Sequence, residues 1–338
     1  MSNRKTGKRK GRGKSRRISL KFGGILLLVL AVWGTAGVWY AHHPRAWLSA
    51  RPVALSNVLL AIGNPLSDLT DALDWTGHDA IYEYDTEAPA GEVLFAGAPV
   101  RIAPPAPGDI RILKRGEFVI GWSDRLRHPV WCAYHVKKDA RYDVGARPGF
   151  ARDKSVPKAP APADYTKSGY DRGHMVPNYA IATRYGDVER KKTFLMSNIA
   201  PQTPSLNRGV WRDVEHRIAD LWTARYGEIW VVVGCISSGS ESIAGTNIDV
   251  PTEYYQLVIA QEGMDVRALA VLFNQQEPWS AWAARSIVTI DELEQKTGLD
   301  FNPELPSFIQ DPLEADLPTR LWPIRLRDIF QLITLRFR

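Results

Sequence analysis

The hydrophobic pattern changes character along the N-terminal third of the chain. Residues 22–41 run for twenty positions without a charged side chain, the length that one helix needs to cross a hydrocarbon core of roughly 30 Å. Residues 46–76 place apolar side chains at helical spacing, interrupted twice by proline, which predicts two short helices. Prolines and small residues dominate residues 88–107 and indicate a linker or an extended edge segment. We therefore expect the main domain to begin near residue 108.

Beyond that point the pattern becomes typical of β-strands. Segments rich in β-branched and aromatic residues cover 111–123, 129–136, 228–236, 253–261 and 266–274. Turn-like residues join the first two segments (Asp124 to Pro129) and the last two (Glu262 and Gly263), so each pair predicts a hairpin.

Two helices are predicted among these strands. One runs from Asn207 to about Tyr226 and is stopped by Gly227. The other runs over residues 289–296, with Thr289 or Asp291 as its cap and Gly298 as its stop. Because strands outnumber helices and do not alternate with them regularly, an α+β layered domain is favoured over a doubly wound parallel sheet.

The charge of the chain is concentrated at its ends. The formal net charge is +6, but residues 1–22 hold ten basic side chains and no acidic one, which leaves a net charge of −4 for the remainder. Without the last 21 residues as well, the net charge is −8. The folded body is acidic, so global charge does not indicate nucleic-acid binding, and local residues must carry such a function.

Residues 22–41 also predict a topology. Trp33, Trp39 and Tyr40 lie towards the C-terminal end of this stretch, where amphipathic rings favour the headgroup region, and the preceding cations should keep the N-terminus cytoplasmic. A signal-anchor would then place the body across the membrane, on the periplasmic side in a bacterium or in the intermembrane space in a mitochondrion. A cleaved signal peptide and an organelle presequence fit the same residues and stay open.

Polar residues suited to phosphodiester chemistry gather after residue 170. His174 follows Gly173, which lets the backbone approach a neighbour closely. Arg172 supplies a permanently charged planar fork suited to phosphate oxygens. Asn207 and Glu215 are eight residues apart on one predicted helix, a net rotation of about 80° that lets both flank one groove. An imidazole base, a hard cation on an amide oxygen and an arginine are the minimum set for hydrolysing a phosphodiester.

The ordered motifs closely resemble one family. Residues 171–174 read DRGH, residues 197–202 read SNIAPQ, and LNRGVW at 206–211 is followed four residues after Trp211 by a glutamate. These motifs are similar to those of the DNA/RNA non-specific endonuclease family, which includes endonuclease G and secreted sugar-non-specific nucleases. The resemblance covers roughly residues 110–306. It implies a ββα-metal (His-Me finger) nuclease domain, with a central, mostly antiparallel sheet flanked by helices. The uncharged stretch 22–41 lies outside the resemblance and adds one transmembrane helix before this domain.

The resemblance also implies roles for the residues that match the motifs. His174 would be the general base that activates water, and Asn207 the sole direct protein ligand of Mg²⁺, for which Mn²⁺ is a substitute. Glu215 matches the acidic residue that holds metal-bound waters, and Arg172 matches the arginine that contacts the phosphate. Since an unperturbed histidine titrates near 6.5, activity is expected to rise with pH through such an ionisation.

Three further residues complete the expected site. Asn198 should help to fix it, and Asp171 should brace the motif loop rather than react. Arg147, in ARPGF, resembles an upstream arginine that stabilises the transition state in some members, on an alignment that needs a gap.

The patterns and the resemblance together divide the chain into five segments. These are a basic cytoplasmic tail (1–21), a transmembrane signal-anchor (22–41), a helical spacer and linker (42–107), the endonuclease domain (108–310) and a basic amphipathic C-terminal tail (311–338). The tail interleaves arginines with apolar residues, which fits a helix docked on the body or one lying on an anionic membrane.

The expected function is therefore a membrane-anchored, Mg²⁺-dependent endonuclease acting on DNA and RNA. Two rivals stay open: a nucleic-acid-binding module that has lost catalysis, and a phosphodiesterase for small substrates. The presence of every matched polar residue argues against the first rival. The preference for DNA or RNA, a homodimer, and pairing of Cys132 with Cys235 also stay open.

Overall fold

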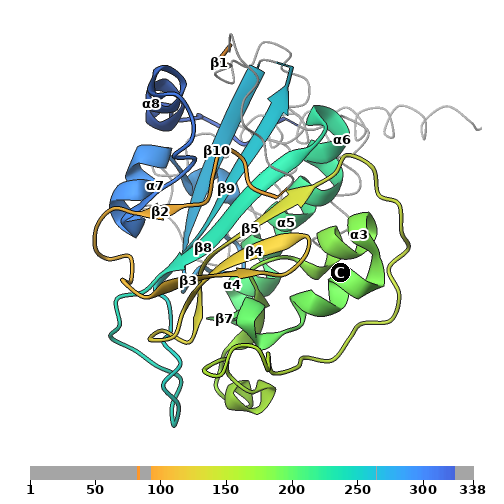
Figure 1. Ribbon diagram of the computed structural model, residues 1–338, viewed down its shortest axis with the longest axis vertical. Coiled ribbons are helices and arrows are strands. Elements are labelled where there is room, and N and C mark those ends of the chain that lie inside the picture. Colours follow the sequence, from red (N-terminus) through yellow and green to blue (C-terminus); the bar gives the residue numbers. More distant parts are fainter. Residues whose placement is uncertain (1–81, 84–92, 264, 324–338) are drawn as a thin grey trace, which may run out of the picture.

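The computed structural model describes residues 82–83, 93–263 and 265–323 (Figure 1). The predicted membrane-crossing stretch 22–41, the short helices predicted in 46–76 and most of the C-terminal tail lie outside these residues. No helix in the described part of the chain is both long enough and apolar enough to cross a membrane.

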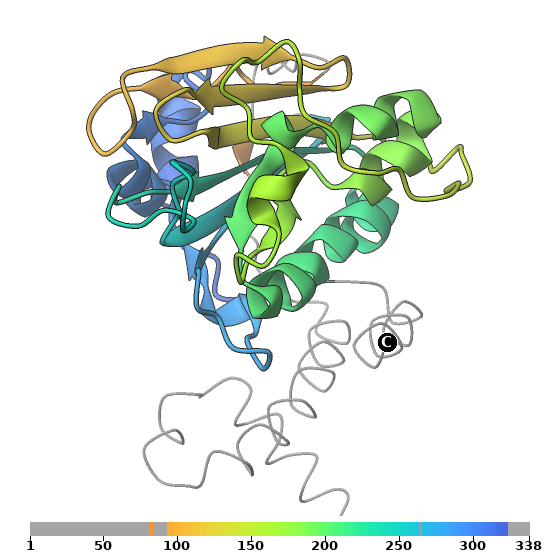
Figure 2. The ribbon, with the colours of Figure 1, turned by 90° about the horizontal axis from the view of Figure 1, so that it is seen from below.

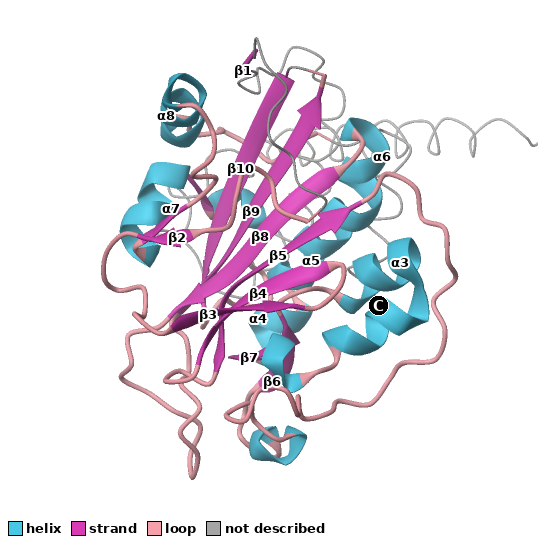
Figure 3. Cartoon of the chain, viewed as in Figure 1, coloured by secondary structure: helices cyan, strands magenta, loops and turns pink. Residues whose placement is uncertain are grey.

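Strands and helices are distributed along the chain much as an α+β domain requires (Figure 3). The strands are β1 (Tyr82–Glu83), β2 (Val100–Arg101), β3 (Ile110–Lys114), β4 (Phe118–Ser123), β5 (His128–Val136), β6 (Asp171–His174), β7 (Ile199–Gln202), β8 (Ile229–Ile236), β9 (Glu253–Glu262), β10 (Asp265–Asn274), β11 (Ile287–Val288) and β12 (Leu299–Asp300). The helices are α3 (Asn178–Thr193), α4 (Pro204–Arg208), α5 (Val210–His216), α6 (Thr223–Tyr226), α7 (Ile290–Thr297) and α8 (Ser307–Ala315).

The central sheet is antiparallel, with strand order β1-β10-β9-β8-β5-β4-β3 and β11 beside β10. Both predicted hairpins are confirmed, as β4–β5 and β9–β10. The stretch predicted at 111–123 is instead two strands, because the chain turns at Gly116, whose φ of 76° suits glycine. Short antiparallel pairs, β2–β12 and β6–β7, lie outside this sheet.

Helices cover both faces of the sheet, so two hydrophobic cores form (Figure 2). On one face Trp122 and Tyr134 pack with Trp211 and other residues of α3 to α6. On the other face Trp131 packs with residues of α7 and α8, among them Leu293. Successive residues of a strand point to opposite faces, which explains why β5 is buried along its whole length.

The helix predicted from Asn207 to Tyr226 is real but not continuous. It begins at Pro204, is broken at Gly209 and passes through a π-helical segment, Arg217–Trp222, before ending at Gly227. Gly209 has φ −99° and ψ −118°, and a Cβ there would collide with the backbone of Ser205. The expected 80° rotation between Asn207 and Glu215 is therefore wrong, since the two residues lie on separate helices.

The second predicted helix is confirmed as α7. The Thr289 hydroxyl accepts a hydrogen bond from the Glu292 amide at 2.9 Å, and Gly298 ends the helix with a φ of 70°. Helices α3 and α8 were not predicted.

The packed domain extends past both predicted boundaries, 108 and 310. Phe95 and Ala106 are buried in the core beside α7 and α8. At the other end, the Trp322 ring lies 5.5 Å from that of Trp222, whose Nε1 donates a hydrogen bond to the Trp322 carbonyl at 2.9 Å. Residues 311–322 are therefore part of the globular body rather than of a separate tail.

Candidate active site

The DRGH motif forms β6, which pairs antiparallel with β7 on the far side of helix α3 in the sequence. The Pro201 carbonyl on β7 accepts hydrogen bonds from the Tyr254 hydroxyl and from Gln275 Nε2, which ties the β6–β7 pair to the central sheet. A Cβ at Gly173 would collide with the side chain of Gln202. The glycine of the motif is therefore required by this close approach.

His174 lies between two phenylalanine rings. Its ring centroid is 5.3 Å from that of Phe150 and 4.8 Å from that of Phe194, which meets it edge-on. Nε2 is buried and has no hydrogen-bond partner among the described residues. Burial, and then the charges of Arg147 and Arg190, lower the pKa of His174 to about 3. The imidazole is therefore neutral across the neutral pH range.

This pKa corrects the expected pH dependence. A pKa near 6.5 belongs to a solvated imidazole. The aromatic cage and the arginines disfavour the charged form of His174, so we no longer expect the ionisation of this ring to set the pH dependence of activity between pH 5 and 8.

Two arginines flank the same aromatic cage. The guanidinium carbon of Arg147 lies 5.8 Å from the centroid of Phe150 and 5.6 Å from that of Phe194, and its side chain is exposed. The Arg172 guanidinium lies 5.5 Å from the Phe150 centroid. It also donates two hydrogen bonds to the Pro162 carbonyl, at 3.0 Å and 2.6 Å. The structure thus brings both arginines beside His174, with Arg172 partly committed to the backbone.

Asn198 is fully buried and binds backbone. Its Oδ1 accepts a hydrogen bond from the Val176 amide, and its Nδ2 donates to the carbonyls of Val176 and Thr193, each at 3.0 Å. Val176 is two residues after His174. Asn198 therefore fixes the chain that leaves the motif, as a positioning residue without contact to solvent.

Asp171 links the motif to Asn207. Asn207 Nδ2 donates to Asp171 Oδ2 at 2.8 Å, and Arg208 donates to both carboxylate oxygens, at 2.8 Å and 2.6 Å. Burial raises the pKa of Asp171, but the bonds from Arg208 and Asn207 outweigh it and hold that pKa below its usual value. A carboxylate can only accept from an amide nitrogen, so the Oδ1 atom of Asn207 is turned away from Asp171.

Glu215 lies on α5, one turn after Trp211. Trp211 Nε1 donates to Glu215 Oε1 at 2.9 Å. Burial raises the pKa of Glu215 to about 8, although the Trp211 bond and the charge of Arg212 lower it. Within the described residues, no hydrogen bond joins Glu215 to Asn207 or to His174.

The donor atoms fit a hard divalent cation. Asn207 presents an amide oxygen whose orientation Asp171 sets, and Glu215 is a half-buried carboxylate whose negative charge is poorly compensated. Both are oxygen ligands of the kind that Mg²⁺ accepts, directly or through water. The raised pKa of Glu215 is the response expected of a carboxylate that lacks a nearby cation.

Sequence reasoning missed the aromatic cage around His174. Phe150 and Phe194 come from segments distant from the motif, although Phe150 is only three residues after Arg147. The sequence signals that could have indicated the cage are Phe150, at the end of ARPGF, and Phe194, which directly precedes LMSN. The two cysteines, whose pairing was left open, are separate buried thiols.

Comparisons with known proteins identify a family and several relatives that resemble this chain. The profile of the DNA/RNA non-specific endonuclease family matches residues 99–308. A nuclease of Nostoc sp. is 28% identical over 230 residues, which covers 64% of this chain and 81% of that protein. The mitochondrial nuclease EXOG of Mus musculus is 29% identical over 206 residues, which spans 55% of each chain. The chain therefore matches little more than half the length of this second relative.

A solved structure shares the fold. The crystal structure of the EndoG/EndoGI complex contains a chain that superposes with a TM-score of 0.53 at 23% identity, covering 60% of this chain and 90% of that chain.

Proposed function

Because the chain belongs to the DNA/RNA non-specific endonuclease family, and is thus a nuclease, we propose that it is a Mg²⁺-dependent endonuclease that hydrolyses phosphodiester bonds in both DNA and RNA. The family is metal-dependent. The choice of Mg²⁺, with Mn²⁺ as a substitute, rests on the oxygen donors of Asn207 and Glu215.

One observation carries the proposal: His174 is held neutral in a cage with an unpartnered Nε2. Buried polar atoms without a hydrogen-bond partner are uncommon in folded proteins, so each one requires an explanation. A water molecule or a substrate oxygen would make the missing hydrogen bond to Nε2. A neutral imidazole can take a proton from that water, which is the requirement for a general base.

The other residues would then act around this base. Asn207 would hold the cation directly, with its amide fixed by Asp171, and Glu215 would hold waters beside it. The cation, when bound, acts as a Lewis acid that offsets charge developing on the phosphate. Arg172 would contact the phosphate, and Arg147, which is exposed beside the cage, would stabilise the additional negative charge of the transition state.

Cleavage of circular DNA tests the proposal. Supercoiled plasmid has no ends, so only an endonuclease converts it to open and linear forms. The proposal predicts conversion with Mg²⁺, none with EDTA, and degradation of a structured RNA under the same conditions. DNA binding without conversion would support a module that has lost catalysis. Hydrolysis of a small phosphodiester without opening of the circle would support the small-substrate phosphodiesterase. Either result would overturn the proposal.

We further propose that residues 22–41 anchor the protein, with the nuclease domain outside the cytoplasm. The support is the uncharged stretch itself and the ten preceding cations. A reporter enzyme that is active only outside the cytoplasm, fused after residue 80, should be active. Activity only of a cytoplasmic reporter at that position would contradict the assignment.

A further inference from the structure

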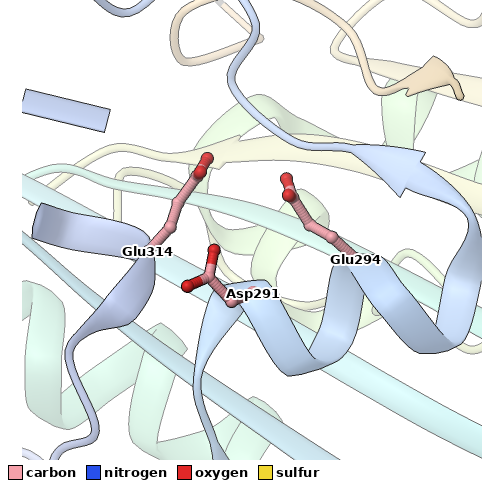
Figure 4. Close-up of side chains that lie close together, drawn as sticks. All are labelled: Asp291, Glu294 and Glu314. Carbon is pink, nitrogen blue, oxygen red and sulfur yellow. The ribbon is translucent and has the colours of Figure 1, made fainter. Parts of the chain in front are cut away.

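A group of three carboxylates lies on the face of the sheet opposite to the β6–β7 pair. Asp291 and Glu294 project from α7, and Glu314 projects towards them from α8 (Figure 4). Their side chains offer oxygen atoms that all lie within 4.8 Å of one another. Both helices belong to the second core, whereas Met175 and Val176, which follow His174, belong to the first. The group is therefore separate from the candidate active site.

The spacing of the oxygens fits one cation. Ca²⁺ binds oxygen ligands at about 2.3–2.6 Å, so two ligands on opposite sides of one ion are about 5 Å apart. Oxygens within 4.8 Å of one another can therefore share an ion without movement of either helix.

Glu314 provides an independent sign that a ligand is needed. Its residue is only 7% exposed, and its Oε1 is buried without a hydrogen-bond partner among the described residues, although hydrogen bonding to the Gln310 side chain lowers the pKa of the group. Figure 4 shows its carboxylate close to those of Asp291 and Glu294. Leaving a buried charged oxygen unpaired costs more than leaving a neutral one, so such an atom requires an explanation.

The surrounding charges favour a cation. Asp300, whose Oδ1 accepts a hydrogen bond from Gln310 at 3.1 Å, adds a fourth negative charge nearby. In residues 93–263 and 265–323, no lysine or arginine forms an ion pair with any of the three carboxylates. Lys296 on the same helix pairs with Glu253 instead, at 3.1 Å. Burial raises the pKa of Glu294 to about 7 and that of Glu314 to about 8, as expected of carboxylates that lack a counterion.

We propose that Asp291, Glu294 and Glu314 bind one Ca²⁺ ion that fastens α7 to α8. An all-oxygen donor set selects a hard cation. Three carboxylates from two helices form no octahedron, and Ca²⁺ tolerates irregular coordination better than Mg²⁺. Glu294 is held in place because its Oε1 accepts a hydrogen bond from the Phe301 amide at 2.7 Å.

Thermal unfolding of the full chain tests this site, with Ca²⁺ as the probe. Protein stripped with EDTA should gain about 5–10 °C in Tm when free Ca²⁺ reaches about 100 times its Kd. The Asn207→Ala variant should gain the same amount, because the proposed catalytic cation is held elsewhere. Glu314→Gln should lose this gain, while Glu292→Gln, an exposed change on the same helix, should keep it.

Asp291→Asn provides a second variant whose folding is not in question, because Asp291 is exposed. Calorimetric titration in the Asn207→Ala background should show one Ca²⁺ site, weakened at least about 10-fold by Asp291→Asn. Two results would overturn the proposal: no Ca²⁺-dependent gain in the wild-type chain, or an equal gain in Glu314→Gln and wild type. The first would mean that protons alone neutralise the three carboxylates.

Discussion

Removing the Asp171 carboxylate should weaken the binding of the catalytic cation without removing any ligand. Asp171 is the only described group that bonds to the side-chain amide of Asn207, at 2.8 Å, and it also receives two bonds from Arg208. In Asp171→Ala the Asn207 side chain is free to rotate, so its Oδ1 spends less time facing the cation. Loss of an outer partner of a metal ligand typically costs about 10–100-fold in metal affinity. That range is about 1.4–2.7 kcal/mol.

Arg208→Ala is the matched control. It removes the other partner of Asp171 but leaves the bond to Asn207 intact. The Arg208 side chain is 59% exposed, and exposed ion pairs contribute about 0.2–1 kcal/mol, which limits its effect on Mg²⁺ affinity to about fivefold. Asp171→Asn keeps an acceptor oxygen but loses the charge. Its Mg²⁺ affinity should therefore lie between those of Asp171→Ala and Arg208→Ala.

The assay is plasmid cleavage as a function of Mg²⁺ concentration. The concentration at half-maximal rate should rise about 10–100-fold in Asp171→Ala. The maximal rate should largely recover at high Mg²⁺. An unchanged half-maximal concentration in Asp171→Ala, or an equal rise in Arg208→Ala, would refute the positioning role.

Three further predictions follow from the site and from the charge of the body. The ring resonances of His174 should not titrate between pH 5 and 8 in NMR of the metal-free protein, whereas a midpoint near 6.5 would contradict the cage. Because the folded pKa of about 3 lies below the unfolded value of 6.5, lowering the pH from 6.5 towards 3 should also destabilise the fold. Gly173→Ala should lower Tm by about 3–10 °C through its collision with Gln202, while Gly149→Ala, where nothing lies within 4 Å of the added Cβ, should leave Tm unchanged. Binding of duplex DNA by metal-free protein that lacks residues 1–42, and with them the ten N-terminal cations, should depend weakly on salt, with a log–log slope of about −2 to −3, since about 0.9 accrues per neutralised phosphate. A slope near −10 would show an extensive basic interface.

The elements that the sequence predicts well are those whose signals are local. Alternation of β-branched and aromatic residues locates β5, β8, β9 and β10, and the ends of α7 follow from Thr289 and Gly298, whose capping bonds reach only a few residues. Such features need no knowledge of what packs against them.

Helix α3 was missed because charged residues occupy buried positions in it. Arg184 and Arg190 are 4% and 3% exposed. Arg184 donates to the carbonyls of Lys137 and Ala219, and Arg190 to those of residues 145 and 146. Buried arginines that satisfy distant carbonyls erase the apolar periodicity on which helix prediction relies.

The sequence motifs predict which residues form the candidate site but not how these residues are arranged. Asp171 contacts Asn207 and Arg208, and its expected role in bracing the motif loop stays a prediction. The pKa of His174 depends on rings at positions 150 and 194, which only the fold brings together. The break at Gly209 likewise follows from a close approach to Ser205 that no periodicity reports.

The central claim is that His174 acts on water and Asn207 acts on the cation. The most direct test is a Mg²⁺ titration of plasmid cleavage by His174→Ala and by Asn207→Ala. His174→Ala should lose about 10²–10⁴-fold in rate at every Mg²⁺ concentration, with the half-maximal concentration unchanged. Asn207→Ala should recover part of its activity as Mg²⁺ is raised. Rescue of His174→Ala by high Mg²⁺, with no rescue of Asn207→Ala, would contradict this assignment of the two roles.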